Sequence, residues 1–192
     1  MQILGLDKSG TPRHWMTPQE AVEAIAKEHV VWSLGDPIVV FRGGWNKDGI
    51  RSVISTPPII AVRGIDFAKQ RKHQRVILNN TSLFSRDMNM CAYCGEVFPN
   101  KRKLSRDHIV PTSRGGVNSW TNCVTACIPC NTRKDNRHPN ECGMTLRYIP
   151  YEPNHHEQLI LRNRHILKDQ MEYLLRGVPA TSRVHDLAKK LH

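Results

Sequence analysis

Four cysteines in two pairs are the residues whose types and spacing most clearly indicate chemistry in this chain. Cys91 and Cys94 form one C-x-x-C turn, and Cys127 and Cys130 form a second. Such a turn delivers two sulfur atoms to one ion, and two turns complete the tetrahedral shell that structural zinc prefers. The sequence therefore predicts a Zn²⁺ ion held by all four thiolates. Since no coordination position stays open for water or substrate, we expect this zinc to be structural.

The segment between the two cysteine pairs is longer than a zinc ribbon needs, because 32 residues separate Cys94 from Cys127. It contains the adjacent residues Asp107 and His108. His108 suits a general base, since an imidazole pKa of about 6.5 leaves much of it neutral at working pH. Asp107 offers hard anionic oxygens, the ligands that Mg²⁺ prefers. Taken alone, such a pair is more often a surface turn, but its place between two zinc-binding turns predicts a hydrolytic centre with a second, catalytic metal ion, Mg²⁺ or Mn²⁺.

Further polar residues surround this pair along the chain. Asn131 follows the last cysteine directly and can add a carbonyl oxygen to the metal on Asp107, although capping a helix N-terminus is an alternative role. Four basic residues flank the predicted centre and can hold phosphates without reading base sequence, or form an ordinary solvated face. They are Arg114, Arg133, Lys134 and Arg137.

From Cys91 to about Met144 the sequence resembles an HNH endonuclease of the ββα-metal (His-Me finger) superfamily, in its four-cysteine zinc form. The matching residues are Cys91-x-x-Cys94-Gly95, Asp107-His108-Ile109-Val110-Pro111, Arg114-Gly115-Gly116, Trp120-x-Asn122 and Ala126-Cys127-x-x-Cys130-Asn131-x-x-Lys134. The resemblance implies that Asn122 braces the loop after His108 and that the product carries a 5′-phosphate. The opening Leu-Asp-x-x-Gly-x-Pro is loosely similar to small bacterial and phage proteins of this family. The cytoplasm of a bacterial cell or phage-infected host is therefore the expected location.

The elements that position these residues follow from local patterns. Adjacent residues of a strand point to opposite faces, so for Asp107 and His108 to line one site the strand before them must end at about Arg106. Pro111 and the Gly115-Gly116 pair then predict an irregular loop.

The neutral first part of the chain predicts a small α/β domain over residues 1–66. A capping box at Thr17-Pro18-Gln19-Glu20 predicts the start of a helix. Short β-branched runs predict strands at 3–6, 30–34, 38–41 and 59–62, with 30–34 and 38–41 paired.

The rest of the chain completes an α+β fold. Residues 67–148 are predicted to form a ββα-metal (His-Me finger) nuclease core stapled by the four-cysteine zinc site. Residues 149–192 predict a C-terminal helical extension, with one helix over about 156–176 and a short helix over 182–191.

The net charge of +11 is concentrated around the predicted centre. Residues 63–147 carry fifteen basic and six acidic side chains, whereas residues 1–62 carry six of each. A basic field at this place favours a polyanionic partner, most simply double-stranded DNA. No apolar run approaches the roughly 18 residues of a membrane span, and the start lacks a basic segment followed by an apolar one. Neither a membrane nor a secretory signal is expected.

These features together predict a metal-dependent DNA endonuclease that nicks or cuts both strands. A non-catalytic zinc-dependent DNA-binding regulatory protein is the alternative from a different class; it accounts for the cysteines and the charge, but not for Asp107, His108 and Asn131 together. A nuclease directed at RNA is a third reading. The sequence leaves the oligomeric state open, a homodimer included.

Overall fold

The computed structural model describes residues 1–63, 77–163 and 165–191, which form two compact units of mixed α+β class. The first unit combines Met1–Gln74 with Asn163–His192, and the second spans Arg75–Arg162. The predicted boundary between residues 66 and 67 lies outside the described residues. The predicted boundary at 148 differs from this division, because the helix that follows it packs within the second unit.

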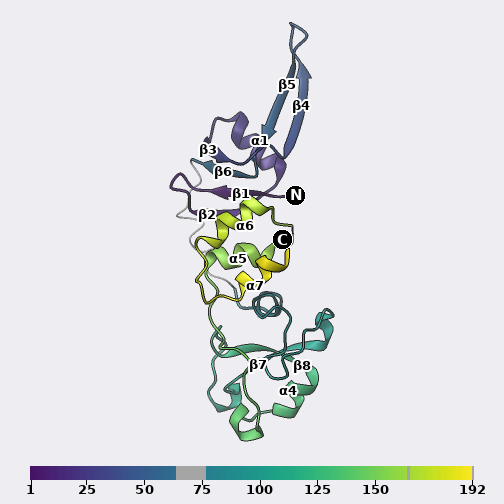
Figure 1. The fold of residues 1–192 in the computed structure, drawn as a ribbon, viewed down its shortest axis with the longest axis vertical. Helices are drawn as coiled ribbons and strands as arrows, with labels where there is room; N and C mark the ends of the chain where they lie inside the picture. The colour runs from purple at the N-terminus through teal and green to yellow at the C-terminus, as the bar shows by residue number, and fades with distance from the viewer. Residues whose placement is uncertain (64–76, 164, 192) are drawn as a thin grey trace. The chain divides into compact units, whose positions relative to one another are not determined.

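A four-stranded sheet forms the centre of the first unit (Figure 1). Its order is β2 (Pro12–Met16), β1 (Ile3–Leu6), β6 (Ile59–Val62) and β3 (Val30–Leu34). β1 runs antiparallel to β2 and parallel to β6, while β3 is antiparallel to β6. Every residue of β1 and β6 is buried, as expected for central strands rich in Ile, Leu and Val.

Helix α1 (Pro18–Ala26) begins where its capping signal predicts. The Thr17 hydroxyl accepts from the backbone N–H of Glu20 at 3.2 Å, and the Glu20 carboxylate accepts from the backbone N–H of Thr17 at 2.7 Å. The helix buries Ala21 and Ala24 in a core shared with residues of the sheet. The predicted helix start is therefore confirmed.

The strand pairing predicted for residues 30–34 and 38–41 is wrong. β3 pairs with β6, and β4 (Val39–Trp45) pairs instead with β5 (Arg51–Thr56) in a separate two-stranded hairpin. The hairpin extends away from the sheet in Figure 1. Its turn is closed by Asn46, whose Oδ1 accepts from the backbone N–H groups of Asp48 and Ile50. The sequence reading lacked the strand at 51–56, so it offered β4 no other partner.

The second unit is built on the antiparallel pair β7 (Leu104–His108) and β8 (Cys123–Cys127), followed at once by α4 (Ile128–Lys134). Helices α3 (Asn80–Arg86) and α5 (His155–Arg162) complete the unit. Its core contains buried residues from α3, both strands and the connecting segments. They include Leu83, Phe84, Tyr93, Leu104, Trp120, Val124 and Met144.

A fully buried ion pair ties α3 to the β7–β8 connection and to β8. The Arg86 guanidinium bonds the Asp87 carboxylate at 2.7 Å and also donates to the carbonyls of Trp120 and Cys123. Asp87 in turn accepts from the backbone N–H of Thr125 at 2.8 Å. Because every partner is fixed by backbone or by the opposite charge, this buried arginine is fully compensated.

The single helix predicted over residues 156–176 is two helices, α5 and α6 (Lys168–Leu175). The Asn163 side chain accepts from the backbone N–H of His165, and the Gln170 side chain accepts from that of Leu167. These local bonds compete with helical ones and explain the break. A last helix, α7 (Val184–Leu191), lies within the predicted range 182–191. Among the described residues, no helix has the length and apolar character needed to span a membrane.

Candidate metal centre and hydrolytic site

The four predicted zinc ligands come together in the second unit. Their Sγ atoms all lie within 4.8 Å of one another, with 4.0 Å between those of Cys94 and Cys127. A zinc tetrahedron with Zn–S bonds of about 2.3 Å separates its sulfurs by roughly 3.8 Å. The four thiols therefore fit a metal such as zinc.

Local backbone structure sets this cluster in place. Gly95 follows the first turn with φ +79°, a left-handed conformation that favours glycine, and its N–H donates to the Cys91 carbonyl. Cys127 ends β8, and Cys130 lies in the first turn of α4. The cluster thus joins the start of the unit to the junction between strand and helix.

The thiols differ in their electrostatic surroundings. Burial acts to raise the pKa of Cys91, but hydrogen bonds from backbone N–H groups outweigh it and lower that pKa on balance. Burial raises the pKa of Cys127, and burial and the neighbouring sulfurs raise that of Cys130. Since a metal binds the deprotonated form, zinc binding to these thiols releases protons.

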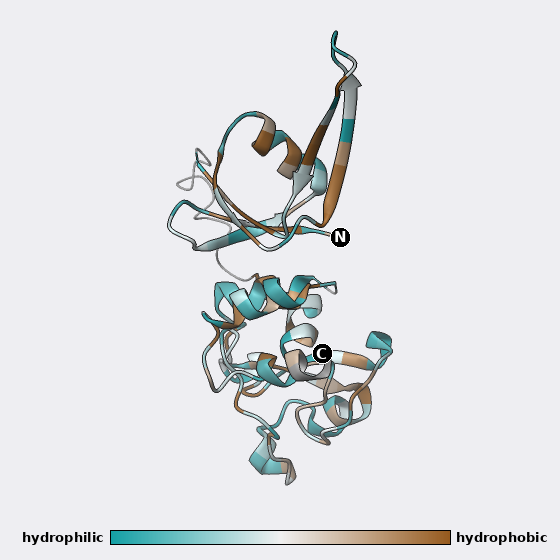
Figure 2. Ribbon diagram, turned by 45° about the horizontal axis from the view of Figure 1, so that its top comes forward, coloured by the Kyte–Doolittle hydropathy of each residue, from teal (hydrophilic) through white to brown (hydrophobic). Residues whose placement is uncertain are grey.

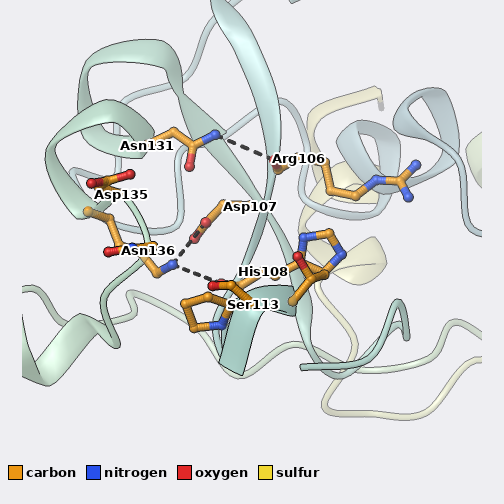
Figure 3. Close-up of a pocket in the computed structure, with 10 residues that line it drawn as sticks. Arg106, Asp107, His108, Ser113, Asn131, Asp135 and Asn136 are labelled. Carbon is orange, nitrogen blue, oxygen red and sulfur yellow. Dashed lines mark hydrogen bonds and ion pairs between the residues drawn. The ribbon is translucent and has the colours of Figure 1, made fainter. Parts of the chain in front are cut away.

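Strand β7 extends further than predicted. It includes Asp107 and His108, which pair with Val124 and Cys123 of β8, so the prediction that the strand ends at Arg106 is wrong. Antiparallel pairing with β8 holds the backbone extended through His108, and the two side chains accordingly point to opposite sides of the strand (Figure 3). Both residues still border one pocket, because His108 is the last residue of the strand.

The pocket lies between the end of β7, the loop after it and the C-terminal end of α4. Its lining consists of Arg106, Asp107, His108, Pro111, Thr112, Ser113, Asn131, Lys134, Asp135 and Asn136. Three of the residues predicted to be catalytic are therefore at one place, and Asn122 is not among those that line it.

Asp107 has a partner on each carboxylate oxygen. Lys134 donates from Nζ to Oδ1 at 3.0 Å, and the hydroxyl of Tyr93 donates to Oδ2. Burial, followed by the bond to Asp107, raises the pKa of Tyr93 well above its usual range, so the phenol stays protonated. A carboxylate accepts about four hydrogen bonds, so each Asp107 oxygen keeps acceptor capacity for a metal ion.

Asn131 lies inside α4, and its amide is oriented by β7. Nδ2 donates to the Ser105 hydroxyl at 2.9 Å and lies 3.5 Å from the Arg106 carbonyl, as Figure 3 shows in part. This leaves the oxygen of the amide as its free end, on the same side of β7 as Asp107. The alternative role as helix cap does not apply, because the residue at the N-cap of α4 is Cys127.

His108 is half-buried, and its ring is held by a residue that the sequence reading did not single out. Nε2 lies 3.3 Å from Oδ1 of Asn118, which also accepts from Arg106 at 2.9 Å. When Nε2 carries the proton and donates to Asn118, Nδ1 keeps a free lone pair. The arrangement can therefore supply a neutral imidazole as a proton acceptor.

Asn122 bonds the loop that follows His108. Its Oδ1 accepts from the backbone N–H of Val110 at 2.9 Å, and its Nδ2 donates to the carbonyls of Val110 and Val117. The loop also passes close to Gly116, where an added Cβ would lie 1.8 Å from the Val110 carbonyl oxygen. This contact with backbone explains why glycine stands at position 116.

The four predicted phosphate contacts are arranged differently from one another. Arg114 forms an exposed ion pair with Glu141 at 2.7 Å, and Arg137 donates to the backbone carbonyl of Arg133 at 2.6 Å. Arg133 is itself exposed. Lys134 is fully buried and donates to Asp107 and to the His108 carbonyl. A lysine that contacts phosphate would instead be expected at the surface. Contact with DNA stays a prediction for all four.

Three residues of the site were missed by the sequence reading. Tyr93 and Asn118 reach it through hydrogen bonds across the unit, and only the position of Tyr93 inside a cysteine turn gave a signal. Asp135 adds a second carboxylate at the pocket, with φ +55° and ψ −141°, a conformation unusual for a residue other than glycine. No spacing rule connects these residues with Asp107 or His108.

Comparison with protein families supports a nuclease. Residues 91–147 match the model of a family described as HNH endonuclease. The matched segment contains both cysteine pairs, β7, β8, α4 and all the residues that line the pocket. A search of curated proteins gave no match.

Proposed function

We propose that this chain, which carries a domain of the HNH endonuclease family over residues 91–147, is a metal-dependent endonuclease that hydrolyses phosphodiester bonds of DNA. The observation that carries the proposal is the pocket bordered by Asp107, His108 and Asn131. It offers a proton acceptor and oxygen ligands for a hard cation within one family domain. Hydrolysis of a phosphodiester needs both.

His108 is the proposed general base. Its ring is half-exposed at the pocket and bonds Asn118 through one nitrogen, so the other can take a proton from water. Asn122 supports this role indirectly, because its bonds to Val110 and Val117 fix the loop that leaves His108.

Asp107 and Asn131 are the proposed ligands for the catalytic Mg²⁺ or Mn²⁺. A carboxylate and an amide oxygen suit such an ion, which keeps several of its waters. When bound, the ion would neutralise charge on the phosphate and stabilise the leaving oxygen. The four cysteines would hold a structural Zn²⁺, because four thiolates leave it no open position.

DNA is the proposed substrate because members of this family act on it and because the cationic charge gathers around the domain. A purely DNA-binding regulatory protein is the less favoured function, since it gives no reason for Asp107, His108 and Asn131 to share a pocket. RNA cleavage is tested by competition between the two nucleic acids.

Replacing His108 with alanine is expected to lower the rate of cleavage by about 100-fold or more, the range for loss of a general base. The assay follows nicking and linearisation of a supercoiled plasmid in Mg²⁺ or Mn²⁺. His29→Ala, at an exposed position of the first unit, is the matched control and should cleave normally. Equal cleavage by the wild type and His108→Ala would exclude His108 from the mechanism. No cleavage by the wild type with any divalent ion, together with salt-sensitive DNA binding, would support the regulatory alternative.

A further inference from the structure

We propose that Tyr93 is a positioning residue that aims the Asp107 carboxylate from inside the zinc-binding turn. This inference deepens the proposed function and rests on it. Tyr93 stands between Cys91 and Cys94, is 6% exposed, and donates its hydroxyl hydrogen to Oδ2 of Asp107. The turn that binds the structural metal therefore also contacts a proposed ligand of the catalytic metal.

The backbone around Tyr93 is anchored on several sides. The N–H of Ala92 donates to the Thr125 carbonyl of β8 at 2.7 Å, and Arg147 donates to the Ala92 carbonyl at 2.7 Å and to the Tyr93 carbonyl at 3.2 Å. The ring itself is part of the buried core. The hydroxyl is thus delivered from a rigid base, so it can fix the direction of Asp107.

The second cysteine turn positions the other proposed ligand, Asn131, which follows Cys130 directly in α4. The orientation of the Asn131 amide is fixed by the hydrogen bond that its Nδ2 donates to the Ser105 hydroxyl. Each half of the zinc cluster thereby sets one oxygen ligand of the pocket, Asp107 through Tyr93 and Asn131 through the helix. The metal held by the cysteines would fix the spacing of these two ligands without touching either.

Tyr93→Phe tests the inference because it deletes one hydroxyl and keeps the ring in the core. With only Lys134 bound, the Asp107 carboxylate is free to rotate, so we expect Mn²⁺ to bind 10- to 100-fold more weakly, the usual effect of removing a ligand-orienting partner. Mn²⁺ affinity is measured by calorimetry on the zinc-loaded protein without DNA. Zinc content should stay at the wild-type value.

Tyr173→Phe is the matched control. The Tyr173 hydroxyl also donates a partly buried hydrogen bond, to the Gly10 carbonyl, and both residues belong to the first unit. This substitution should leave Mn²⁺ affinity unchanged. Wild-type Mn²⁺ affinity in Tyr93→Phe would overturn the inference, as would a loss of zinc in proportion to the loss of Mn²⁺ binding. Because this measurement needs no cleavage, it is independent of whether the wild type cuts DNA, and failure of the nuclease assay is recognised separately.

A second, independent observation concerns the β4–β5 hairpin, which we infer to be a DNA-contacting ribbon. This inference also rests on the proposed function. The hairpin is highly exposed along its length, with Val40 54%, Trp45 71%, Ile50 64% and Val53 57% accessible. Figure 2 shows apolar stretches on both strands. The base of the ribbon contacts α1, but a two-stranded ribbon beyond such support gains little stability, so the exposure of these apolar side chains indicates a partner.

The charge of the hairpin favours a polyanionic partner. Within the neutral segment 1–62, the hairpin range 39–56 carries three basic residues and one acidic residue, whereas the remaining positions carry three basic and five acidic residues. Although segment 1–62 has no net charge, its hairpin is therefore cationic and the remainder of the segment is anionic. A cationic, two-stranded ribbon suits DNA, whose major groove admits one.

The three cationic side chains of the ribbon are all exposed to solvent. Arg42 lies opposite Val53 in the register, Arg51 lies opposite Trp45, and Lys47 is in the turn. The Arg51 guanidinium lies over the Trp45 ring, 5.8 Å from its centroid. Flat aromatic and cationic groups at a tip can contact both bases and phosphates.

The test replaces Arg42, Lys47 and Arg51 together by glutamine in the full chain. We expect affinity for a DNA duplex to fall at least 10-fold and the slope of log affinity against log salt to decrease by roughly 3, about one for each lost phosphate contact. Fluorescence anisotropy at several salt concentrations measures both. The control carries the same loss of charge on the same unit, through Lys8→Gln, Lys27→Gln and Lys168→Gln, and should bind nearly as the wild type does.

Two results would overturn the DNA-contacting ribbon. One is wild-type affinity and salt slope in the triple hairpin variant. The other is a wild-type dimer, seen by sedimentation, that Trp45→Ser converts to a monomer, because the hairpin would then contact a second copy. Neither result would contradict the nuclease proposal. Plasmid cleavage by the same variants is measured at saturating DNA, where the rate depends on His108 and its pocket and not on affinity for DNA.

Discussion

Cys94→Ser is expected to unfold the segment 91–147 rather than merely slow catalysis. The four sulfurs lie within 4.8 Å of one another and join the first turn to β8 and α4, so they hold together chain segments far apart in sequence. Binding of structural zinc contributes about 10–16 kcal/mol in small zinc domains, and most of it is folding energy. Circular dichroism, zinc content and limited proteolysis would show a metal-free protein that is cleaved within this segment.

Cys142→Ser provides the matched control for this prediction. Cys142 lies outside the metal cluster and points its thiol at the carbonyls of His138 and Pro139, bonds that a serine hydroxyl can replace. This variant should keep both zinc and fold. A soluble, folded and zinc-free Cys94→Ser protein would contradict the structural role of the metal, as would retention of fold after removal of zinc by a strong chelator.

Lys134→Met is expected to destabilise the zinc-loaded protein by about 3–5 kcal/mol, the cost of leaving a buried charge without its partner. The side chains of Lys134 and Asp107 are 1% and 6% exposed, and their ion pair measures 3.0 Å. Methionine keeps the volume of the side chain but removes the ammonium. Urea unfolding in the absence of other divalent ions measures the loss.

Two comparisons make this second prediction specific. Lys134→Met combined with Asp107→Asn should recover much of the stability, because no unpaired charge remains. Mg²⁺ or Mn²⁺ should stabilise Lys134→Met more than the wild type, since a cation bound to the folded state only would compensate Asp107. Additive losses in the double variant, or no difference in the response to metal, would show that Asp107 does not depend on a neighbouring cation.

Spacing along the chain predicted those features that depend on neighbouring residues. Two C-x-x-C turns were sufficient for the four-cysteine cluster, and the Thr17 capping box was sufficient for the start of α1. The interrupted C-terminal helix was missed although its cause is also local. Its apolar stripe runs through the break, and the local bonds from Asn163 to His165 and from Gln170 to Leu167 outweigh that pattern.

Features that depend on pairing across the chain were not predictable in the same way. The extension of β7 to His108 depends on β8, whose Cys123 and Val124 hold that backbone extended. The link from Tyr93 to Asp107 joins residues whose types are ordinary for a core and become part of a site only by folding. Lys134 likewise reads as a surface cation at the end of a helix, and only the placement of α4 against β7 turns it inward.

The discontinuous make-up of the first unit has a consequence for the order in which the protein folds during synthesis. The buried Gln170 side chain donates to the carbonyls of Gln2 and Pro58, 168 and 112 residues earlier in the chain. These bonds cannot form until α6 has left the ribosome, by which time the whole of residues 75–162 has been made. The zinc-binding unit can therefore fold first, while the first unit is completed only after a helix encoded near the other end of the chain has been made.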